Sequence, residues 1–361
     1  DLDFALLHGV DYIGLSFVQR GEDVAEAKEI AAGRAWIMTK MEKPQALDNM
    51  DDILALSDAV MVARGDLGVE LPPEEVPLAQ KRIIRAARER GIPVVVATQM
   101  LESMISAPAP TRAEASDVAT AVFDGADAVM LSAETAAGQY PQEAVNIMER
   151  IVERVERDPG WRTLTDAARP VTERRSDAAI ASAARQVADT IGAAAIMAFT
   201  LGGSTALRVA RERPECPVLG LTTSLETARR LSLVWGVHAV VTPETHTMSE
   251  TVTRAVRIAR TEGFANAGQE VVVTAGVPFN QPGSTNALRV ARGQQVSYRV
   301  DGIFVADLGF LGRPSFGPYT LVQGLLQEYA LSSPEGVALM CLAEALLRIP
   351  DAATRDALIR D

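Results

Sequence analysis

The chain contains 361 residues, of which 48% are hydrophobic and 23% are charged. This length predicts two or three domains with large cores, and the composition excludes disordered, collagen-like and disulfide-stapled chains. The net charge is −12, distributed as −13 over residues 1–160, +4 over residues 161–293 and −3 over residues 294–361, which argues against a nucleic-acid partner.

The first 157 residues alternate short apolar runs with amphipathic stretches. The expected strands are Asp11–Val18, Arg34–Met41, Asp58–Ala63, Pro93–Thr98 and Asp127–Ser132. The expected helices are Gly21–Ala32, Pro44–Leu56, Glu74–Arg90, Arg112–Phe123 and Gln142–Arg157. This alternation, repeated at roughly 23–35 residues, predicts βα units and a parallel sheet.

Each of these strands ends in polar residues. The endings are Ser16, Lys40 with Glu42, Arg64-Gly65-Asp66, Thr98-Gln99, and Ser132 with Glu134. A (β/α)₈ barrel places its site on the C-terminal ends of successive strands, whereas an open doubly wound sheet binds its ligand at one switch point. Five consecutive polar endings favour the barrel. Because five strands cannot close one, three further βα units are expected upstream, and the chain is expected to begin inside a domain.

Residues 158–175 are rich in Pro, Arg and Thr and are expected to form a linker. Residues 176–291 predict a second, three-layer α/β domain. Its expected elements are helices Ser176–Ile191, Thr205–Arg213, Leu225–Trp235 and Met248–Thr261, with strands Ala194–Thr200, Pro217–Thr222, Ala239–Thr242 and Glu270–Thr274. Residues 292–361 change character: an irregular stretch is followed by three expected helices, Tyr319–Leu331, Pro334–Arg348 and Ala352–Arg360.

One lysine stands out, because the chain has 31 Arg but only four Lys. Lys40 lies in an apolar strand, where a buried ammonium is costly unless it is paired. Glu42 points the same way on a strand of period two. Together with Asp66 on the next strand end, it makes a pair of hard oxygen ligands suited to Mg²⁺ or Mn²⁺. The alternatives are a lysine that reaches solvent and an aspartate that caps a plain turn.

Other residues carry weaker signals. Thr98 is suited to hold an oxygen or to shuttle a proton, although such a threonine is more often a helix N-cap. Ser132 and Glu134 are weak candidates by themselves. The loop Thr200-Leu201-Gly202-Gly203-Ser204-Thr205, between a strand and a helix, is suited to cradle a phosphate, and a plain βα turn is the equal alternative.

The two cysteines, Cys216 and Cys341, lie far apart and predict neither a disulfide framework nor a zinc site. A reducing cytoplasm is therefore the expected compartment. No apolar run reaches about 18 residues, so no membrane span is predicted.

Six stretches of the chain have a family resemblance. They are residues 12–18 (YIGLSFV), 40–45 (KMEKPQ), 61–70 (MVARGDLGVE), 97–104 (ATQMLESM), 110–114 (PTRAE) and 130–135 (MLSAET). Through them, residues 1–291 closely resemble pyruvate kinase. The resemblance implies an α/β fold: the last five βα units of a TIM (β/α)₈ barrel over residues 1–157 and an effector domain over 176–291. Residues 292–361 lie outside it and are expected to form an irregular segment and a helical tail of different origin.

The resemblance also implies an activity, a transferase that moves phosphate from phosphoenolpyruvate to ADP in glycolysis, giving pyruvate and ATP. Lys40 would stabilise the transferring phosphoryl group and the enolate oxygen, and Glu42 and Asp66 would bind Mg²⁺. The amides of Gly65 and Asp66, with Thr98, would hold the substrate carboxylate. Thr98, Ser132 and Glu134 would belong to the proton path, and these residues suit a reaction that depends on positioning and charge neutralisation.

Further partners follow from the same resemblance. Thr200, Gly202, Gly203, Ser204 and Thr205 would bind a phosphorylated-sugar effector, and the protein would form a cytoplasmic homotetramer. K⁺ would be required, but its ligands and most nucleotide contacts are expected outside this chain, so the chain alone is expected to turn over little or no substrate.

The tail has its own resemblance. Residues 326–350 (LQEYALSSPEGVALMCLAEALLRIP) resemble the N-terminal helical region of the bifunctional proline dehydrogenase/aldehyde dehydrogenase. We expect two sequences of different origin to join near Arg292, through either a gene fusion or an artefact of sequence assembly. Two alternatives to a pyruvate kinase fragment remain: a catalytically dead binding module that keeps the metal and effector sites, and a proline-catabolism fusion fragment.

Overall fold

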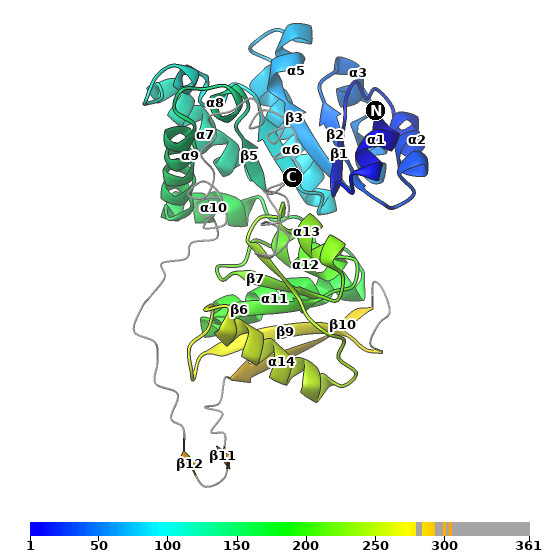
Figure 1. The fold of residues 1–361 in the computed structure, drawn as a ribbon, viewed down its shortest axis with the longest axis vertical. Helices are drawn as coiled ribbons and strands as arrows, with labels where there is room; N and C mark the ends of the chain where they lie inside the picture. The colour runs from blue at the N-terminus through cyan, green and yellow to red at the C-terminus, as the bar shows by residue number, and fades with distance from the viewer. Residues whose placement is uncertain (279–283, 293–298, 301–302, 305–361) are drawn as a thin grey trace, which may run out of the picture. The chain divides into compact units, whose positions relative to one another are not determined.

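The computed structural model describes residues 1–278 and 284–292, with the backbone of residues 299–300 and 303–304 (Figure 1). Within this part the chain forms two compact units. One comprises Asp1–Val171 with Ser232–Trp235, and the other comprises Thr172–Leu231 with the described residues from Gly236 onward. The three helices expected in the tail lie outside the described residues. Two short strands, β11 (Arg299–Val300) and β12 (Ile303–Phe304), pair with each other.

The first unit contains a five-stranded parallel sheet whose spatial order follows the chain, β1-β2-β3-β4-β5. The strands are β1 (Tyr12–Leu15), β2 (Trp36–Met41), β3 (Ala59–Ala63), β4 (Val94–Ala97) and β5 (Ala128–Met130). All four residues of β4 are buried, as expected for a parallel strand that is covered on both faces. A doubly wound sheet reverses its strand order at a switch point, so the sequential order confirms a barrel-type arrangement.

Helices alternate with these strands, which confirms the α/β class. They are α1 (Leu2–Leu7), α2 (Gly21–Ala31), α3 (Pro44–Asp48), α4 (Met50–Leu56), α5 (Arg64–Glu70), α6 (Val76–Arg90), α7 (Arg112–Asp124), α8 (Ala133–Ala136), α9 (Pro141–Glu156) and α10 (Pro159–Ala167), with a 3₁₀ turn, η1 (Glu102–Ile105). In α6 the buried residues Ala79, Ile83 and Ala87 recur every fourth position, so one stripe of the helix faces the core.

Backbone conformation shortens two of the expected strands. Expected strand Asp11–Val18 ends at Leu15, because Phe17 has φ +59. Expected strand Pro93–Thr98 ends at Ala97, because Thr98 has φ +69. A residue in the left-handed region cannot continue an extended strand.

Two helices correct the sequence analysis. α5 begins directly at Arg64, where only a turn was expected. α10 occupies Pro159–Ala167, inside the expected linker 158–175, so of these residues only Asp158 and 168–175 lack a helix or strand. The Asp158 carboxylate accepts a hydrogen bond from the Gly160 amide and caps α10. Trp161 is 6% exposed, and its indole N–H donates to the Val122 carbonyl. Burial of this tryptophan explains why a segment of linker-like composition is helical.

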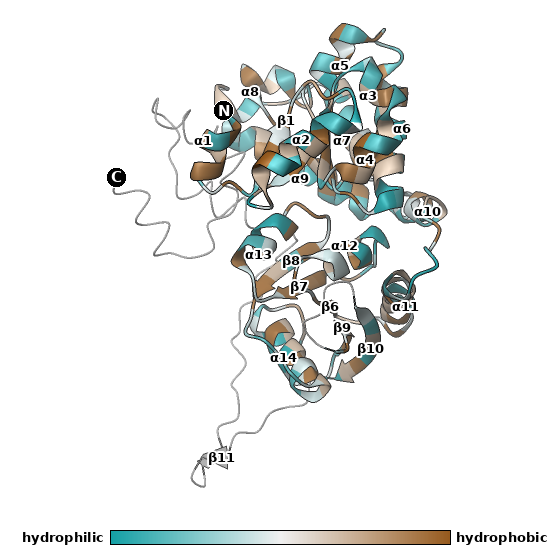
Figure 2. Ribbon diagram, turned by 90° about the vertical axis from the view of Figure 1, so that its right-hand side faces the viewer, coloured by the Kyte–Doolittle hydropathy of each residue, from teal (hydrophilic) through white to brown (hydrophobic). Residues whose placement is uncertain are grey.

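The second unit is a three-layer α/β domain. Its sheet has the order β10-β9-β6-β7-β8, in which only β10 is antiparallel to its neighbour. The strands are β6 (Ala195–Phe199), β7 (Val218–Thr222), β8 (Val237–Val241), β9 (Glu270–Gly276) and β10 (Thr285–Arg292), and the helices are α11 (Ser176–Ile191), α12 (Ser204–Arg211), α13 (Leu225–Leu231) and α14 (Met248–Thr261). Figure 2 shows β7 and β8 predominantly brown, whereas α12 and α13 also carry teal, hydrophilic residues.

None of the helices that the structure describes is long and apolar enough to cross a bilayer.

Candidate active site

The candidate residues of the first unit follow the carboxyl ends of neighbouring strands. Lys40 is the last but one residue of β2, and Glu42 comes directly after that strand. Asp66 is the third residue of α5, which begins immediately after β3. Thr98 follows β4. Because all of these strands are parallel neighbours, the candidates lie along one edge of the sheet, as predicted from the polar strand endings.

Lys40 is the centre of this group. Its Nζ lies 2.8 Å from Glu42 Oε2 and 3.9 Å from Asp66 Oδ2, and it donates to the Ser16 hydroxyl at 3.0 Å. The Lys40 side chain is 25% exposed, so its ammonium is paired and still reachable from solvent. The lysine therefore meets both predicted carboxylates, and the alternative of a lysine that only reaches solvent does not describe it.

Glu42 is the most deeply buried of the three, with a side chain that is 1% exposed. Its Oε1 accepts a hydrogen bond from the Phe17 amide at 2.5 Å. Its Oε2 accepts no hydrogen bond of good geometry, although it forms an ion pair with Lys40 Nζ. A buried carboxylate oxygen in this situation is poised for a further positive charge.

The residues present fit a magnesium ion. Glu42 Oε2 is a buried oxygen that lacks a hydrogen bond, and Asp66, on the neighbouring strand end, has a side chain that is 56% exposed. Mg²⁺ is typically held by one or two carboxylates, with water and substrate phosphate completing its octahedron. Within the described part of the chain no group of three or more His, Cys, Asp or Glu residues is arranged to hold a metal. Two carboxylates suit a magnesium ion whose remaining ligands are water and substrate, and not a metal site built from protein ligands alone.

Thr98 occupies a strained turn. Thr98 and Gln99 both have positive φ, +69 and +54. The Thr98 hydroxyl donates to the Ala97 carbonyl at 2.6 Å and accepts from the Gly65 amide at 2.7 Å. It is therefore no helix N-cap, and in this state it satisfies the Gly65 amide that was predicted to hold the substrate carboxylate.

Glu134 has a different environment from the one expected of a proton carrier. It is 3% exposed, and its two oxygens accept hydrogen bonds from the amides of Leu101 and Ser132, at 3.1 and 2.8 Å. Both oxygens thus tie the loop after β4 to the end of β5. Ser132 is the N-cap residue of α8, and its side chain makes no cap hydrogen bond.

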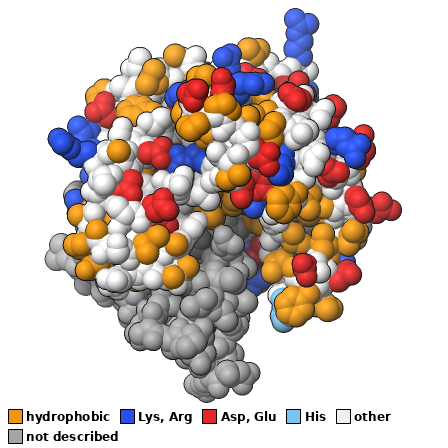
Figure 3. Space-filling model, turned by 90° about the horizontal axis from the view of Figure 1, so that it is seen from above, with side chains coloured by type: hydrophobic (Ala, Val, Ile, Leu, Met, Phe, Trp, Pro, Cys, Tyr) orange, Lys and Arg blue, Asp and Glu red, His pale blue; other side chains and the backbone are white. Residues whose placement is uncertain are grey.

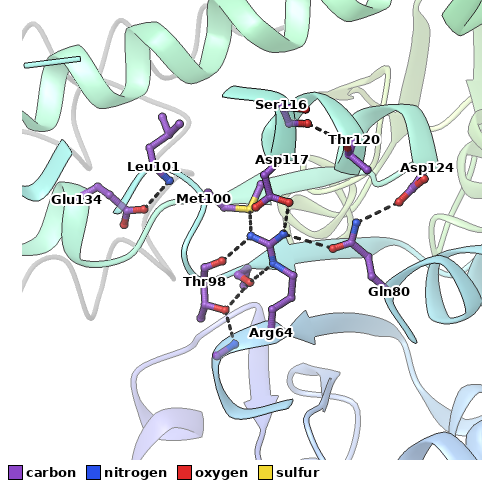
Figure 4. Close-up of polar contacts among 12 residues, drawn as sticks. Arg64, Gln80, Thr98, Met100, Leu101, Ser116, Asp117, Thr120, Asp124 and Glu134 are labelled. Atoms are coloured by element: carbon purple, nitrogen blue, oxygen red, sulfur yellow. Dashed lines mark hydrogen bonds and ion pairs between the residues drawn. The ribbon is translucent and has the colours of Figure 1, made fainter. Parts of the chain in front are cut away.

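Arg64 was given no role by the sequence analysis, yet its guanidinium is the most connected group at this edge (Figure 4). It lies close to the Ala97 and Thr98 carbonyls, the Met100 sulfur and the Asp117 carboxylate. The side chain is only 10% exposed. The signal that could have revealed it is its place directly before Gly65 and Asp66, where an arginine follows an apolar strand.

The charges on the surface do not form a single-sign field on the face that Figure 3 shows. Red and blue side chains of the described residues are interspersed there with hydrophobic ones. A nucleic-acid interface typically presents a basic patch, so this face gives no support for one.

The second unit carries a pocket at the predicted effector loop. Thr200, Gly202, Ser204 and Thr205 line it, whereas Gly203, at φ +92, turns the chain into α12. Other lining residues are Thr222, Thr223, Thr242, Thr245, Ser284 and Thr285. The Thr200 hydroxyl is buried without a hydrogen-bond partner, and the Thr205 hydroxyl is bonded to Thr285 at 2.7 Å. Among the described lining residues the one charged side chain is Glu244, so the positive balance of this domain does not lie in the pocket.

Comparison with known families decides the assignment. Residues 1–145 match the family model of the pyruvate kinase barrel domain, and residues 178–291 match that of the pyruvate kinase alpha/beta domain. Residues 1–291 belong to the pyruvate kinase family. The resemblance of this part of the chain is thereby confirmed.

Individual relatives agree. The chain is 56% identical over 291 residues to a pyruvate kinase from Methylorubrum extorquens, covering 81% of this chain and 61% of the relative. It is 52% identical to one from Agrobacterium vitis, covering 81% and 62%. A crystal structure of a pyruvate kinase from Cryptosporidium parvum superposes with a TM-score of 0.75 at 37% identity, over 81% of this chain and 60% of that one. The chain thus spans about three fifths of the length of these relatives.

The tail matches a different family. Residues 321–361 match the model of the DNA-binding domain of proline dehydrogenase. The resemblance of the tail to the proline-catabolising enzyme is therefore confirmed, although its three expected helices lie outside the described residues.

Proposed function

We propose that this chain is the magnesium- and enolate-binding part of a pyruvate kinase, a transferase that moves the phosphoryl group of phosphoenolpyruvate to ADP. The observation that carries the proposal is the Lys40 ammonium, which lies 2.8 Å from Glu42 and 3.9 Å from Asp66 at the carboxyl ends of β2 and β3. This arrangement supports phosphoryl transfer, which depends on positioning and neutralised charge. The proposed setting is the cytoplasm.

The protein's own residues divide the work. Glu42 and Asp66 would hold Mg²⁺, which when bound supplies positive charge to the phosphoryl and enolate oxygens of the substrate. Lys40 would add its ammonium to the same oxygens in the transition state. The Gly65 and Asp66 amides, with Thr98, would hold the carboxylate, and Thr98 and Ser132 would lie on the proposed proton path. Glu134, which is bound to two amides, would fix that path's geometry.

Metal binding can be tested without turnover. Calorimetric titration of the chain with Mn²⁺ is expected to show one site, which is lost in Glu42→Gln and Asp66→Asn. Asp51→Asn is the matched control, because Asp51 is an exposed carboxylate (82%) of the same unit. Equal affinity in the control and the two site variants would refute the assignment. The K⁺ requirement belongs to the same proposal, with its ligands outside this chain.

Turnover separates an enzyme from a dead binding module. A lactate-dehydrogenase-coupled assay is expected to detect little or no pyruvate formation by the chain alone. Any activity found has to disappear in Lys40→Met and persist in Lys81→Met, which removes an exposed lysine (53%) from α6. Activity that survives Lys40→Met would remove Lys40 from the mechanism.

A second candidate function is effector binding in the second unit, as a phosphorylated sugar at residues 200–205. The buried Thr200 hydroxyl without a partner supports it, since such a group usually meets a ligand or water. Fructose bisphosphate and inorganic phosphate are the probes, followed by amide chemical shifts of the full chain. We expect shifts at Ser204 and Thr205 that Thr200→Val weakens and the exposed control Thr190→Val does not. If the chemical shifts of both amides stay unchanged, the loop is a plain βα turn without an effector site.

The tail calls for one further test. The family that it matches is described as DNA-binding, whereas the charge balance of the chain predicts no nucleic-acid partner. Fluorescence anisotropy with a labelled DNA duplex at low salt tests whether the chain binds DNA. Binding that disappears when residues 293–361 are deleted would contradict the prediction. The proposed homotetramer is tested separately by analytical ultracentrifugation of the same chain.

A further inference from the structure

We propose that Arg64 is a positioning residue of this site, which holds the loop after β4 so that the Thr98 hydroxyl meets the Gly65 amide. The proposal rests on the proposed function, because it concerns the carboxylate-binding side of that site. Arg64 is a strongly connected group at this edge of the sheet that the mechanism above does not use.

The loop that Arg64 contacts has an unusual backbone. Thr98 and Gln99 are consecutive non-glycine residues at φ +69 and +54. Such residues rarely occupy the left-handed region, and two in a row persist only where the surroundings hold them. The backbone carbonyls at such a turn need hydrogen-bond donors from outside the turn.

Arg64 supplies those donors. Its Nε donates to the Ala97 carbonyl at 3.3 Å, and one terminal nitrogen donates to the Thr98 carbonyl at 2.6 Å. The same nitrogen lies 2.7 Å from the Met100 sulfur. The planar guanidinium therefore spans the turn from the residue before it to the residue after it.

The other side of the guanidinium is anchored to two helices (Figure 4). Its second terminal nitrogen lies 2.6 Å from Asp117 on α7 and 3.4 Å from Gln80 on α6. Gln80 in turn donates to Asp124 at 3.0 Å. Asp117 neutralises the buried cation, and the fixed helices give Arg64 one orientation.

Holding this turn also fixes the contact between Thr98 and the Gly65 amide, which is a proposed ligand of the substrate carboxylate. With the turn held, Thr98 Oγ1 lies 2.7 Å from the Gly65 nitrogen, and Gly65 directly follows Arg64 in α5. One side chain thus joins the start of α5 to the loop after β4. A lysine cannot reproduce this, because it lacks the planar fork that reaches two carbonyls and a carboxylate together.

The test compares Arg64→Lys with Arg85→Lys, a matched change at an exposed arginine (83%) of α6, in the full chain. The first readout is hydrogen exchange of the Gly65 amide. The second is the affinity for oxalate in the presence of Mn²⁺, since oxalate is a planar dicarboxylate shaped like the enolate. We expect Arg64→Lys to speed Gly65 exchange and to weaken oxalate by about tenfold each, with β3 amides changed by less than about twofold. The control should change neither readout.

The outcomes are separable. Arg64→Lys values that match the control in both readouts would overturn the positioning role. If the unmodified chain binds neither Mn²⁺ nor oxalate, the proposed function fails, and Gly65 exchange alone decides the role of Arg64. Should Arg64→Lys not fold, Asp117→Asn replaces it, because loss of the neutralising carboxylate should accelerate Gly65 exchange in the same direction. An unchanged Gly65 rate in Asp117→Asn would also count against the proposal.

Discussion

The ion pair between Lys40 and Glu42 allows a quantitative prediction. Replacing Lys40 by Met keeps an unbranched side chain that is one atom shorter and removes the cation that lies 2.8 Å from Glu42 Oε2. Glu42 is 1% exposed, so its carboxylate is then buried without a compensating charge. Removal of one partner from a fully buried pair costs about 3–5 kcal/mol.

The structure reduces this figure. Lys40 is 25% exposed, so solvent already screens part of the attraction. The Phe17 amide continues to donate to Glu42 Oε1. We therefore expect Lys40→Met to lower the free energy of unfolding by about 2 kcal/mol. In a Glu42→Gln background, where no buried charge remains, the same change should cost less than about 0.5 kcal/mol.

Tryptophan fluorescence during urea unfolding measures this double-mutant cycle. All three tryptophans, Trp36, Trp161 and Trp235, belong to the first unit, so the signal reports on the unit that contains the pair. Mg²⁺ provides a second arm. It should stabilise Lys40→Met more than the unmodified chain, because Lys40 no longer competes for Glu42. A coupling energy below about 0.5 kcal/mol would show that the pair is not coupled, and a larger Mg²⁺ effect on the unmodified chain would refute the competition.

Three further predictions concern other parts of the chain. Burial alone would raise the pKa of Glu114, but hydrogen bonds from Ser103 and Thr111 outweigh it and hold the pKa below its usual range. A lowered pKa stabilises the folded protein above the pKa of the unfolded state, and this stabilisation is lost as the pH falls through the pKa of the folded state. Glu114→Gln should therefore reduce the loss of unfolding free energy at acidic pH. An unchanged loss would refute this. Burial, followed by the charge of Asp189, raises the pKa of the Cys216 thiol to about 12, and peptide mapping at neutral pH should find it alkylated only after unfolding. Gly125, at φ +97, ends α7 beside the Arg88 side chain, so Gly125→Ala should lower the unfolding free energy by about 1–2 kcal/mol, whereas a change within about 0.3 kcal/mol would contradict the crowding.

Local patterns account for the placement of the strand-end residues that the sequence predicted to lie together. Lys40 and Glu42 are two residues apart at a strand end, and the period of a strand brings them to one side. Asp66 follows the next strand, and parallel neighbours bring their carboxyl ends to one edge. The resemblance of the motifs to pyruvate kinase adds the prediction that these three residues act together. This placement depends only on the spacing of residues along each strand and on the order of neighbouring strands, and not on a particular long-range side-chain contact.

The helical segments that the sequence missed have a different cause. Residues 158–175 have the composition of a linker, yet Asp158 caps α10, Pro159 is its first residue, and Trp161 is buried against the carbonyl of Val122. α5 begins at Arg64 without a cap side chain. The Asp158-Pro159 start of α10 is a local helix signal that the linker-like composition hid, whereas α5 has no such signal and depends on tertiary packing.

The tertiary structure alone decided how the strand-end residues are held. Phe17 reaches Glu42 across 25 positions of sequence, and Arg64 reaches Thr98 and Asp117 across 34 and 53. The left-handed conformations of Thr98 and Gln99 occur in residues that normally avoid them. Side-chain period and strand order depend on neighbouring residues and can be read locally. These contacts depend on how strands and helices pack, and the packing is a property of the whole sheet and its helices.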